Sequence, residues 1–112
     1  MGELDKYTSE ESWQQTLIAL LHAFHFKVAH FRPARVMIKG QETYRTPVSA
    51  DGKGFPDILA ARKGRLVAIE VKGETGSMTP EQEDWLNVLA SAGAETYVAR
   101  PSDFDYLKEA LR

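Results

Sequence analysis

The sequence contains no cysteine, which excludes a disulfide framework and a thiolate zinc site. It also lacks any apolar run that approaches the ~20 residues needed to cross a bilayer. The first residues, MGELDKYTSEE, are acidic and polar, unlike a secretory signal or an Arg-rich transit peptide. We therefore expect a cytoplasmic protein that works in a reducing compartment and does not enter a membrane.

What the sequence does contain is typical of a soluble globular protein, with 43% hydrophobic and 27% charged residues. Its 112 residues are enough for one domain of ordinary size and too few for two. We find no internal repeat and no low-complexity segment. Residues 1–112 are therefore expected to form a single domain.

The charge is unevenly distributed, although the formal net charge is only −2. Between Lys27 and Lys72 there are ten Lys and Arg residues against four Asp and Glu residues, which makes this region a candidate surface for a polyanion. Ordinary solvated surface cations would give the same count, so charge alone does not decide between the two interpretations. The candidate phosphate contacts are Arg32, Arg35, Lys39, Arg45, Lys53 and Lys63.

A helix is predicted over residues 9–24, with Ser9 as its N-cap and acidic residues in its first turn. Its apolar residues repeat with helical spacing, and the same stripe followed backward reaches Gln14 and Glu10. We therefore expect Glu10 to point along the buried face of this helix.

A strand with an alternating pattern is predicted over residues 26–31 and includes His30. After it the signal weakens. Residues 32–54 could form a hairpin around Gly40 and Gln41, but their Gly, Pro and Ser content favours a long loop. Loops of that length inside a compact domain are often functional.

The stretch GFPDILAARKGRLVAIEVKG contains two apolar runs separated by a Lys-Gly turn, which predicts an antiparallel hairpin of residues 55–62 and 65–72. Side chains alternate along a strand, so Glu70 and Lys72 should project from the same face with Cα atoms about 6.6 Å apart. Ionisable groups on a buried strand are costly unless they are paired or bind an ion. The hairpin therefore indicates a site.

Residues 79–92 carry strong helix signals, with Thr79 at the N-cap and Gln82 placed to complete a capping box. Gln82 also lies on the apolar stripe of that helix. A strand over residues 94–100 and a short terminal helix capped by Ser102 follow. The order of elements predicts an α/β fold, in which helices pack on a mixed sheet.

Ionisable residues occupy four positions where the surrounding pattern calls for apolar side chains: Glu10, Asp57, Glu70 and Lys72. Carboxylates brought together repel one another unless a cation lies between them. Oxygen ligands favour Mg²⁺ or Mn²⁺, and the main-chain carbonyl of Val71 is a possible extra ligand. A hard divalent ion beside a lysine suits phosphodiester hydrolysis. Taken singly, the Glu-Lys pair could be exposed neighbours and Asp57 a turn residue, but their conjunction favours a site.

These residues resemble the PD-(D/E)xK nuclease pattern, with Pro56-Asp57 followed by Glu70-Val71-Lys72. The wider context, GFPD…IEVKGETGSMTPEQEDWLNVLASAGAETYVARPSD, is similar to the VRR-NUC family, the virus-type replication and repair nucleases. The likeness includes the N-terminal SEESWQQ and the strand VAHF, and it covers almost the whole chain. It matches poorly over residues 32–53.

The resemblance implies a restriction-endonuclease-like mixed central sheet flanked by helices, an αβββαβ core with a short C-terminal helix. It implies a metal-dependent nuclease of a bacterial or phage-infected cell, with Mg²⁺ or Mn²⁺ as cofactor. The metal ligands would be Asp57 and Glu70, Lys72 would be catalytic, and Glu10 would complete the site. Further residues expected around the metal or the phosphate are Gln14, Gln82 and His30. For Gln82 a purely capping role is an equal alternative, and for His30 an ordinary hydrogen-bonded strand histidine is favoured.

Small nucleases of this kind resemble structure-selective enzymes that act on branched DNA such as four-way junctions or flaps. Resolving a junction needs two symmetric cuts, so a homodimer is expected. Its interface could include Trp13, Phe104 or Tyr106, although the monomer core is the favoured place for Trp13. Two alternatives stay open: a DNA-binding module of the same fold without catalysis, and a nuclease for linear duplex.

Overall fold

The computed structural model describes residues 2–31, 34–38, 40–45 and 48–112, and the side chains of residues 10–31, 40 and 48–112. The helices and strands follow in the order α1 (Gly2–Ala23), β1 (Lys27–His30), β2 (Ala34–Ile38), β3 (Gln41–Arg45), β4 (Ile58–Arg62), β5 (Arg65–Val71), α2 (Pro80–Ser91), β6 (Glu95–Ala99), the 3₁₀ turn η1 (Pro101–Asp103) and α3 (Phe104–Ala110). None of the described helices combines the length and apolar composition required to cross a membrane.

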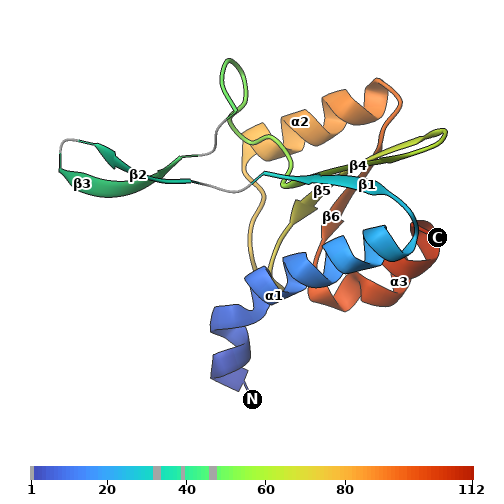
Figure 1. Cartoon of the computed structure of the whole chain (residues 1–112), viewed down its shortest axis with the longest axis horizontal. Coiled ribbons are helices and arrows are strands. Elements are labelled where there is room, and N and C mark those ends of the chain that lie inside the picture. The colour runs from blue at the N-terminus through green and yellow to red at the C-terminus, as the bar shows by residue number, and fades with distance from the viewer. Residues whose placement is uncertain (1, 32–33, 39, 46–47) are drawn as a thin grey trace.

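The main sheet has four strands in the order β1-β4-β5-β6 (Figure 1). The β1–β4 and β4–β5 pairs are antiparallel and the β5–β6 pair is parallel, which confirms an α/β fold with a mixed sheet. The expected αβββαβ succession is interrupted, because β2 and β3 form a separate two-stranded sheet between β1 and β4.

The preference for a long loop over residues 32–54 is wrong where β2 and β3 form. Gly40 lies in the turn between them with a φ of +78°, a conformation that glycine adopts without steric cost. The β-forming residues on either side of this turn outweighed the Pro and Ser of the flanking sequence.

Two predicted helix caps are also wrong. The backbone is already helical at Ser9, because α1 begins at Gly2 and its first turns contain good helix formers. Ser102 lies inside the 3₁₀ turn, whose Asp103 side chain accepts a hydrogen bond from the Arg100 amide at 3.0 Å. A serine caps a helix only where the backbone before it is not helical, and local sequence does not show where that break falls.

The core lies between the sheet and the pair α1 and α3, whereas α2 covers the opposite face (Figure 1). Strand β5 shows why, because Val67, Ile69 and Val71 join the core with residues of α1 and α3. The alternate residue Glu70 faces α2 and is also buried. The predicted alternation along this strand is confirmed.

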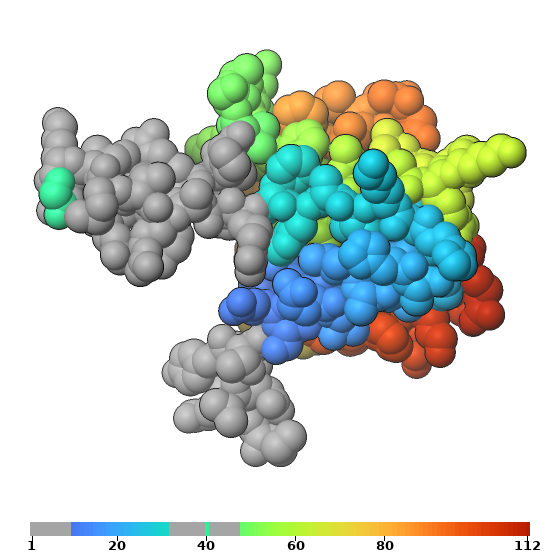
Figure 2. Space-filling model, in the orientation of Figure 1, coloured from blue at the N-terminus to red at the C-terminus, as the bar shows by residue number. Residues whose placement is uncertain are grey.

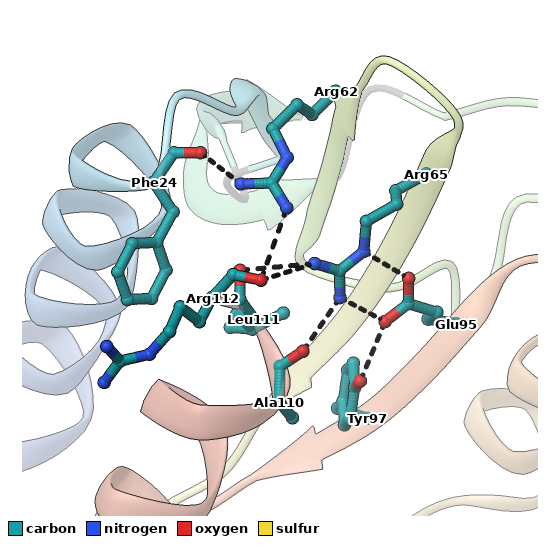
Figure 3. A network of polar contacts seen from close by, with 8 residues as sticks. All are labelled: Phe24, Arg62, Arg65, Glu95, Tyr97, Ala110, Leu111 and Arg112. Atoms are coloured by element: carbon teal, nitrogen blue, oxygen red, sulfur yellow. Dashed lines mark hydrogen bonds and ion pairs between the residues drawn. The ribbon is translucent and has the colours of Figure 1, made fainter.

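Two arginines that flank the β4–β5 turn donate hydrogen bonds to main-chain carbonyls at the C-terminal ends of α1 and α3 (Figure 3). Arg62 donates a hydrogen bond to the Phe24 carbonyl at 2.6 Å, just after α1. Arg65 donates to both carboxylate oxygens of Glu95 at 2.7 and 2.6 Å. It also donates to the main-chain carbonyls of Ala110, Leu111 and Arg112. Each arginine therefore satisfies carbonyls that a helix end leaves without an intrahelical partner.

Candidate active site

Asp57 lies where β4 begins, beside the end of β5. Its Oδ2 accepts a hydrogen bond from the Val71 amide at 2.8 Å, and its carbonyl accepts one from the Phe31 amide at 2.8 Å. The antiparallel register pairs Ile58 with Ile69, which brings Asp57 to the level of the Glu70–Lys72 segment. The hairpin thus joins two carboxylates that are thirteen positions apart in the sequence.

Glu70 is the one charged residue that is buried in the described part of the chain, with 3% of its surface exposed. Its Oε2 accepts a hydrogen bond from Gln82 Nε2 at 3.1 Å and lies 3.7 Å from Lys72 Nζ. Its Oε1 is buried and has no hydrogen-bond partner among the described residues. A buried carboxylate oxygen in that condition is costly unless an ion or a proton occupies it.

The surroundings of Glu70 favour its neutral form. Burial raises the pKa of Glu70 to about 8, and Asp57 adds to the rise through its charge and by accepting a hydrogen bond from Glu70 when Glu70 is protonated. Lys72 lowers the pKa of Glu70, but by less than the other causes raise it. Two neighbouring carboxyl groups thus share one proton unless a cation replaces it.

Gln82 completes the predicted capping box and also contacts Glu70. Its Oε1 accepts a hydrogen bond from the Thr79 amide at 2.9 Å, and Thr79 Oγ1 accepts one from the Gln82 amide at 3.2 Å, which completes the predicted capping box. The remaining amide nitrogen is then directed at Glu70. The cap therefore fixes the orientation of the side chain that holds Glu70.

The loop before Asp57 packs closely against the start of α2. Gly54 has a φ of +82°, and a Cβ there would lie 2.7 Å from the Glu81 main-chain carbon. Next to it, the Phe55 ring makes edge contacts with Phe31 at 5.2 Å and with Trp85 at 4.9 Å between ring centroids. The elements that carry Asp57 and Gln82 are thus held together.

Glu10, Gln14 and His30 lie on α1 and β1, outside the hairpin that carries Asp57 and Glu70. Glu10 is exposed, so its predicted burial is wrong: among the described side chains of α1, burial begins only at Trp13. Its charge nevertheless acts on Glu70 and raises the pKa of that carboxyl group. Gln14 is half-buried one turn further along α1, and His30 ends β1 opposite Ile58, next to Asp57.

The predicted phosphate contacts are placed only in part, because the side chains of Arg32, Arg35, Lys39 and Arg45 lie outside the described residues. Lys53 is in the loop before Asp57 and forms an exposed ion pair with Glu81 at 3.8 Å. Lys63 is in the β4–β5 turn, about 20 Å from Asp57 at the rise of an extended strand. That turn and the loop of residues 48–53 project from different sides of the molecule (Figure 2).

The predicted interface residues differ in accessibility. Trp13 belongs to the core, and its Nε1 donates a hydrogen bond to the Ala99 carbonyl at 2.8 Å. Phe104 packs edge-on against Trp13 at 6.2 Å and is partly buried. Tyr106 is 65% exposed and thus available for a contact.

Sequence reasoning assigned no role to Arg100, which shapes the loop after Lys72. Its guanidinium donates to the carbonyl of Gly73 at 2.7 Å and to that of Glu74 at 3.3 Å. Glu74 in turn accepts a hydrogen bond from the Ser102 amide at 2.6 Å. The sequence signal for Arg100 is the Arg-Pro-Ser segment after the last strand. The contact of Arg100 with the loop after Lys72 could not be predicted from that segment, because it depends on the parallel pairing of β5 with β6.

The residues present fit a hard divalent ion. Within the described part of the chain, no three Asp, Glu or His side chains converge on one point as a ready-made metal site. Mg²⁺ does not need three such ligands, because it retains several waters and is commonly bound by one or two carboxylates. Asp57 and the unpartnered Oε1 of Glu70 supply that donor set.

The mixed sheet, with Asp57, Glu70 and Lys72 at one end of its two inner strands, is compatible with a nuclease-like α/β fold. Residues 42–103, more than half of the chain, match the family model described as the VRR-NUC domain. The chain belongs to the VRR-NUC domain family, and its general function is nuclease-type processing of DNA. Nucleases of this family generally depend on a divalent metal ion. Comparisons with curated proteins and with solved structures gave no match.

Proposed function

We propose that the protein is a divalent-metal-dependent DNA endonuclease that hydrolyses phosphodiester bonds in branched DNA, such as four-way junctions or flaps. The main support is the buried Glu70, whose Oε1 has no hydrogen-bond partner among the described residues and which lies beside Asp57 and Lys72. Without a metal this oxygen takes up a proton that Glu70 shares with Asp57, and a divalent ion can replace that proton.

In this proposal Asp57, Glu70 and the Val71 carbonyl hold Mg²⁺ or Mn²⁺, and Glu10 adds negative charge from α1. The bound ion supplies Lewis-acid polarisation of the phosphoryl group. Lys72 presents its ammonium group to the phosphate as a point charge and stabilises the negative charge that develops there. Gln82 keeps Glu70 in place, while Gln14 and His30 are at the periphery.

Branched-DNA selectivity rests on symmetry. One chain carries one such site, whereas the resolution of a four-way junction requires two cuts, which a C₂ dimer supplies. The exposed Tyr106 is the proposed interface anchor among the three aromatic candidates. Measurement of mass in solution should give a dimer, and a monomer that still cuts both strands of a junction symmetrically would contradict this part of the proposal.

A cleavage panel tests the activity. Labelled four-way junction, flap and linear duplex are incubated with the protein in Mg²⁺, in Mn²⁺ and in EDTA. We expect branched DNA to be cut only with metal, and Glu70→Gln and Lys72→Ala to lose cleavage. The matched controls Glu83→Gln and Lys108→Ala remove exposed charges from α2 and α3 and should keep it.

Cleavage that survives EDTA, or that survives both site substitutions, would overturn the proposal. Tight junction binding without cleavage in any divalent ion would favour the non-catalytic DNA-binding module. A site-specific digest of linear duplex would favour the duplex nuclease.

A further inference from the structure

The β2–β3 hairpin pairs with no other strand in the described part of the chain. Figure 1 shows it reaching away from the four-stranded sheet. Its five cross-strand pairs run from Ala34 with Arg45 to Ile38 with Gln41. An isolated two-stranded hairpin is at best marginally stable in water, so a partner is expected along it.

The segment that contains this hairpin begins and ends at the candidate active site. The chain leaves the main sheet after β1 and returns to it at Asp57, and the Phe31 amide donates a hydrogen bond to the Asp57 carbonyl at 2.8 Å. The segment between β1 and β4, which contains the hairpin, thus begins and ends beside a candidate metal ligand. A ligand bound along the hairpin would therefore lie on a segment whose two ends meet at Asp57.

Aromatic contacts hold the loop of residues 48–56, which leads from the hairpin back to β4. The Phe55 ring lies between the rings of Phe31 and Trp85, and Trp85 Nε1 donates a hydrogen bond to the Asp51 carbonyl at 2.9 Å. These contacts connect the end of β1, the loop before Asp57 and α2. The end of β1 and the loop before Asp57 therefore belong to the same packed unit as Gln82.

The charge and size of the hairpin suit duplex DNA. Residues 34–45 contain three cations and one acid, although the whole chain has a net charge of −2. Five residues per strand span about 17 Å, and a two-stranded ribbon fits the major groove, which is about 12 Å wide. We propose that the β2–β3 hairpin is an arm that holds a duplex segment of the substrate beside Asp57. This inference rests on the proposed function, because it requires DNA as the substrate.

Binding without cleavage tests the arm. The affinity for a labelled four-way junction is measured in EDTA at several salt concentrations, for the parent chain and for the Arg35→Gln, Arg45→Gln double variant. A lost phosphate contact lowers the salt slope by about 0.9 and the affinity near 0.1 M salt by about tenfold. We expect a loss of roughly 10- to 60-fold for one to two lost contacts. Since no metal is present, the result does not depend on whether the protein cuts DNA.

Two further variants separate DNA contact from a loss of folding. Glu42→Gln removes the one acid of the hairpin and should tighten binding, whereas damage to the hairpin would weaken binding in every variant. Lys108→Gln removes an exposed cation from α3 and should leave the affinity and the salt slope unchanged. An unchanged slope in the double variant would overturn the proposal. So would a double variant that changes the mass in solution but not the DNA affinity, because the hairpin would then be a contact between copies.

Discussion

Replacing Glu70 by Gln should make the metal-free protein more stable at alkaline pH. The substitution keeps the size of the side chain and its contact with Gln82 but removes the group whose charged form is disfavoured. Glu70 is 3% exposed, so water does not relieve the cost of its charge. The effect should therefore be large enough to measure.

The magnitude follows from the pKa of Glu70, which is raised from an ordinary value of 4.5 to about 8. Between these two values the folded protein binds the proton that the unfolded chain has released, so the free energy of unfolding decreases as the pH rises. One pKa unit corresponds to about 1.36 kcal/mol, which gives a decrease on the order of 4 kcal/mol from about pH 5 to about pH 8. The Gln variant lacks this decrease.

Urea unfolding in EDTA, followed by tryptophan fluorescence at several pH values, measures the difference. Glu95→Gln is a control of opposite sign. The hydrogen bond from Arg65 lowers the pKa of Glu95, so the stability that Glu95 contributes is lost as the pH falls. Parallel pH profiles for the parent chain and Glu70→Gln would show that the folded protein does not hold Glu70 neutral.

Three further predictions concern metal binding at Glu70, the packing of Gly54 against α2, and the hydrogen bonds from Arg65 to the end of α3. Mg²⁺ uptake near pH 7 should release about one proton, because the ion replaces the proton on Glu70. Calorimetry in buffers of different ionisation heat measures the number of protons released. Release of no proton would contradict a proton shared between Glu70 and Asp57. Gly54→Ala should lower the free energy of unfolding by about 1–3 kcal/mol more than Gly64→Ala, since both have positive φ but only Gly54 is crowded by α2; equal losses in urea unfolding would refute the packing argument. Arg65→Gln should speed amide hydrogen exchange in α3 more than Arg112→Gln does, because Arg65 donates hydrogen bonds to the carbonyls at the end of that helix. Equal exchange rates in the two variants would show that Arg65 does not stabilise the helix end.

Local patterns were sufficient for much of the fold. Alternation along β5 correctly placed Glu70 and Lys72 on one face, because strand geometry has a fixed period of two. The Thr79–Gln82 capping box was correct for the same reason: all of its contacts lie within four residues. The Lys-Gly turn likewise gave the β4–β5 hairpin. Features that depend on contacts between residues close in the sequence can therefore be predicted from the sequence alone.

Other features depended on more than the local pattern. Ser9 has the chemistry of a cap, but helix formation in the residues before it prevailed. Glu10 lies on the helical stripe that faces the core further along, yet its own side chain is exposed. The 34–45 hairpin formed where turn-rich composition favoured a loop. For Ser9 and for the 34–45 hairpin, the preference of neighbouring residues exceeded the local one; the exposure of Glu10 depends instead on which elements pack against α1.

The sequence by itself determined which residues are ionisable, which face of each strand they occupy and where the second helix begins. Only the tertiary structure decided that Gln82 reaches Glu70, that Asp57 accepts the Val71 amide, and that one oxygen of Glu70 is buried without a partner among the described residues. The physical reason is desolvation. The cost of a carboxylate depends on what surrounds it in three dimensions, and those surroundings come from segments that the sequence keeps apart.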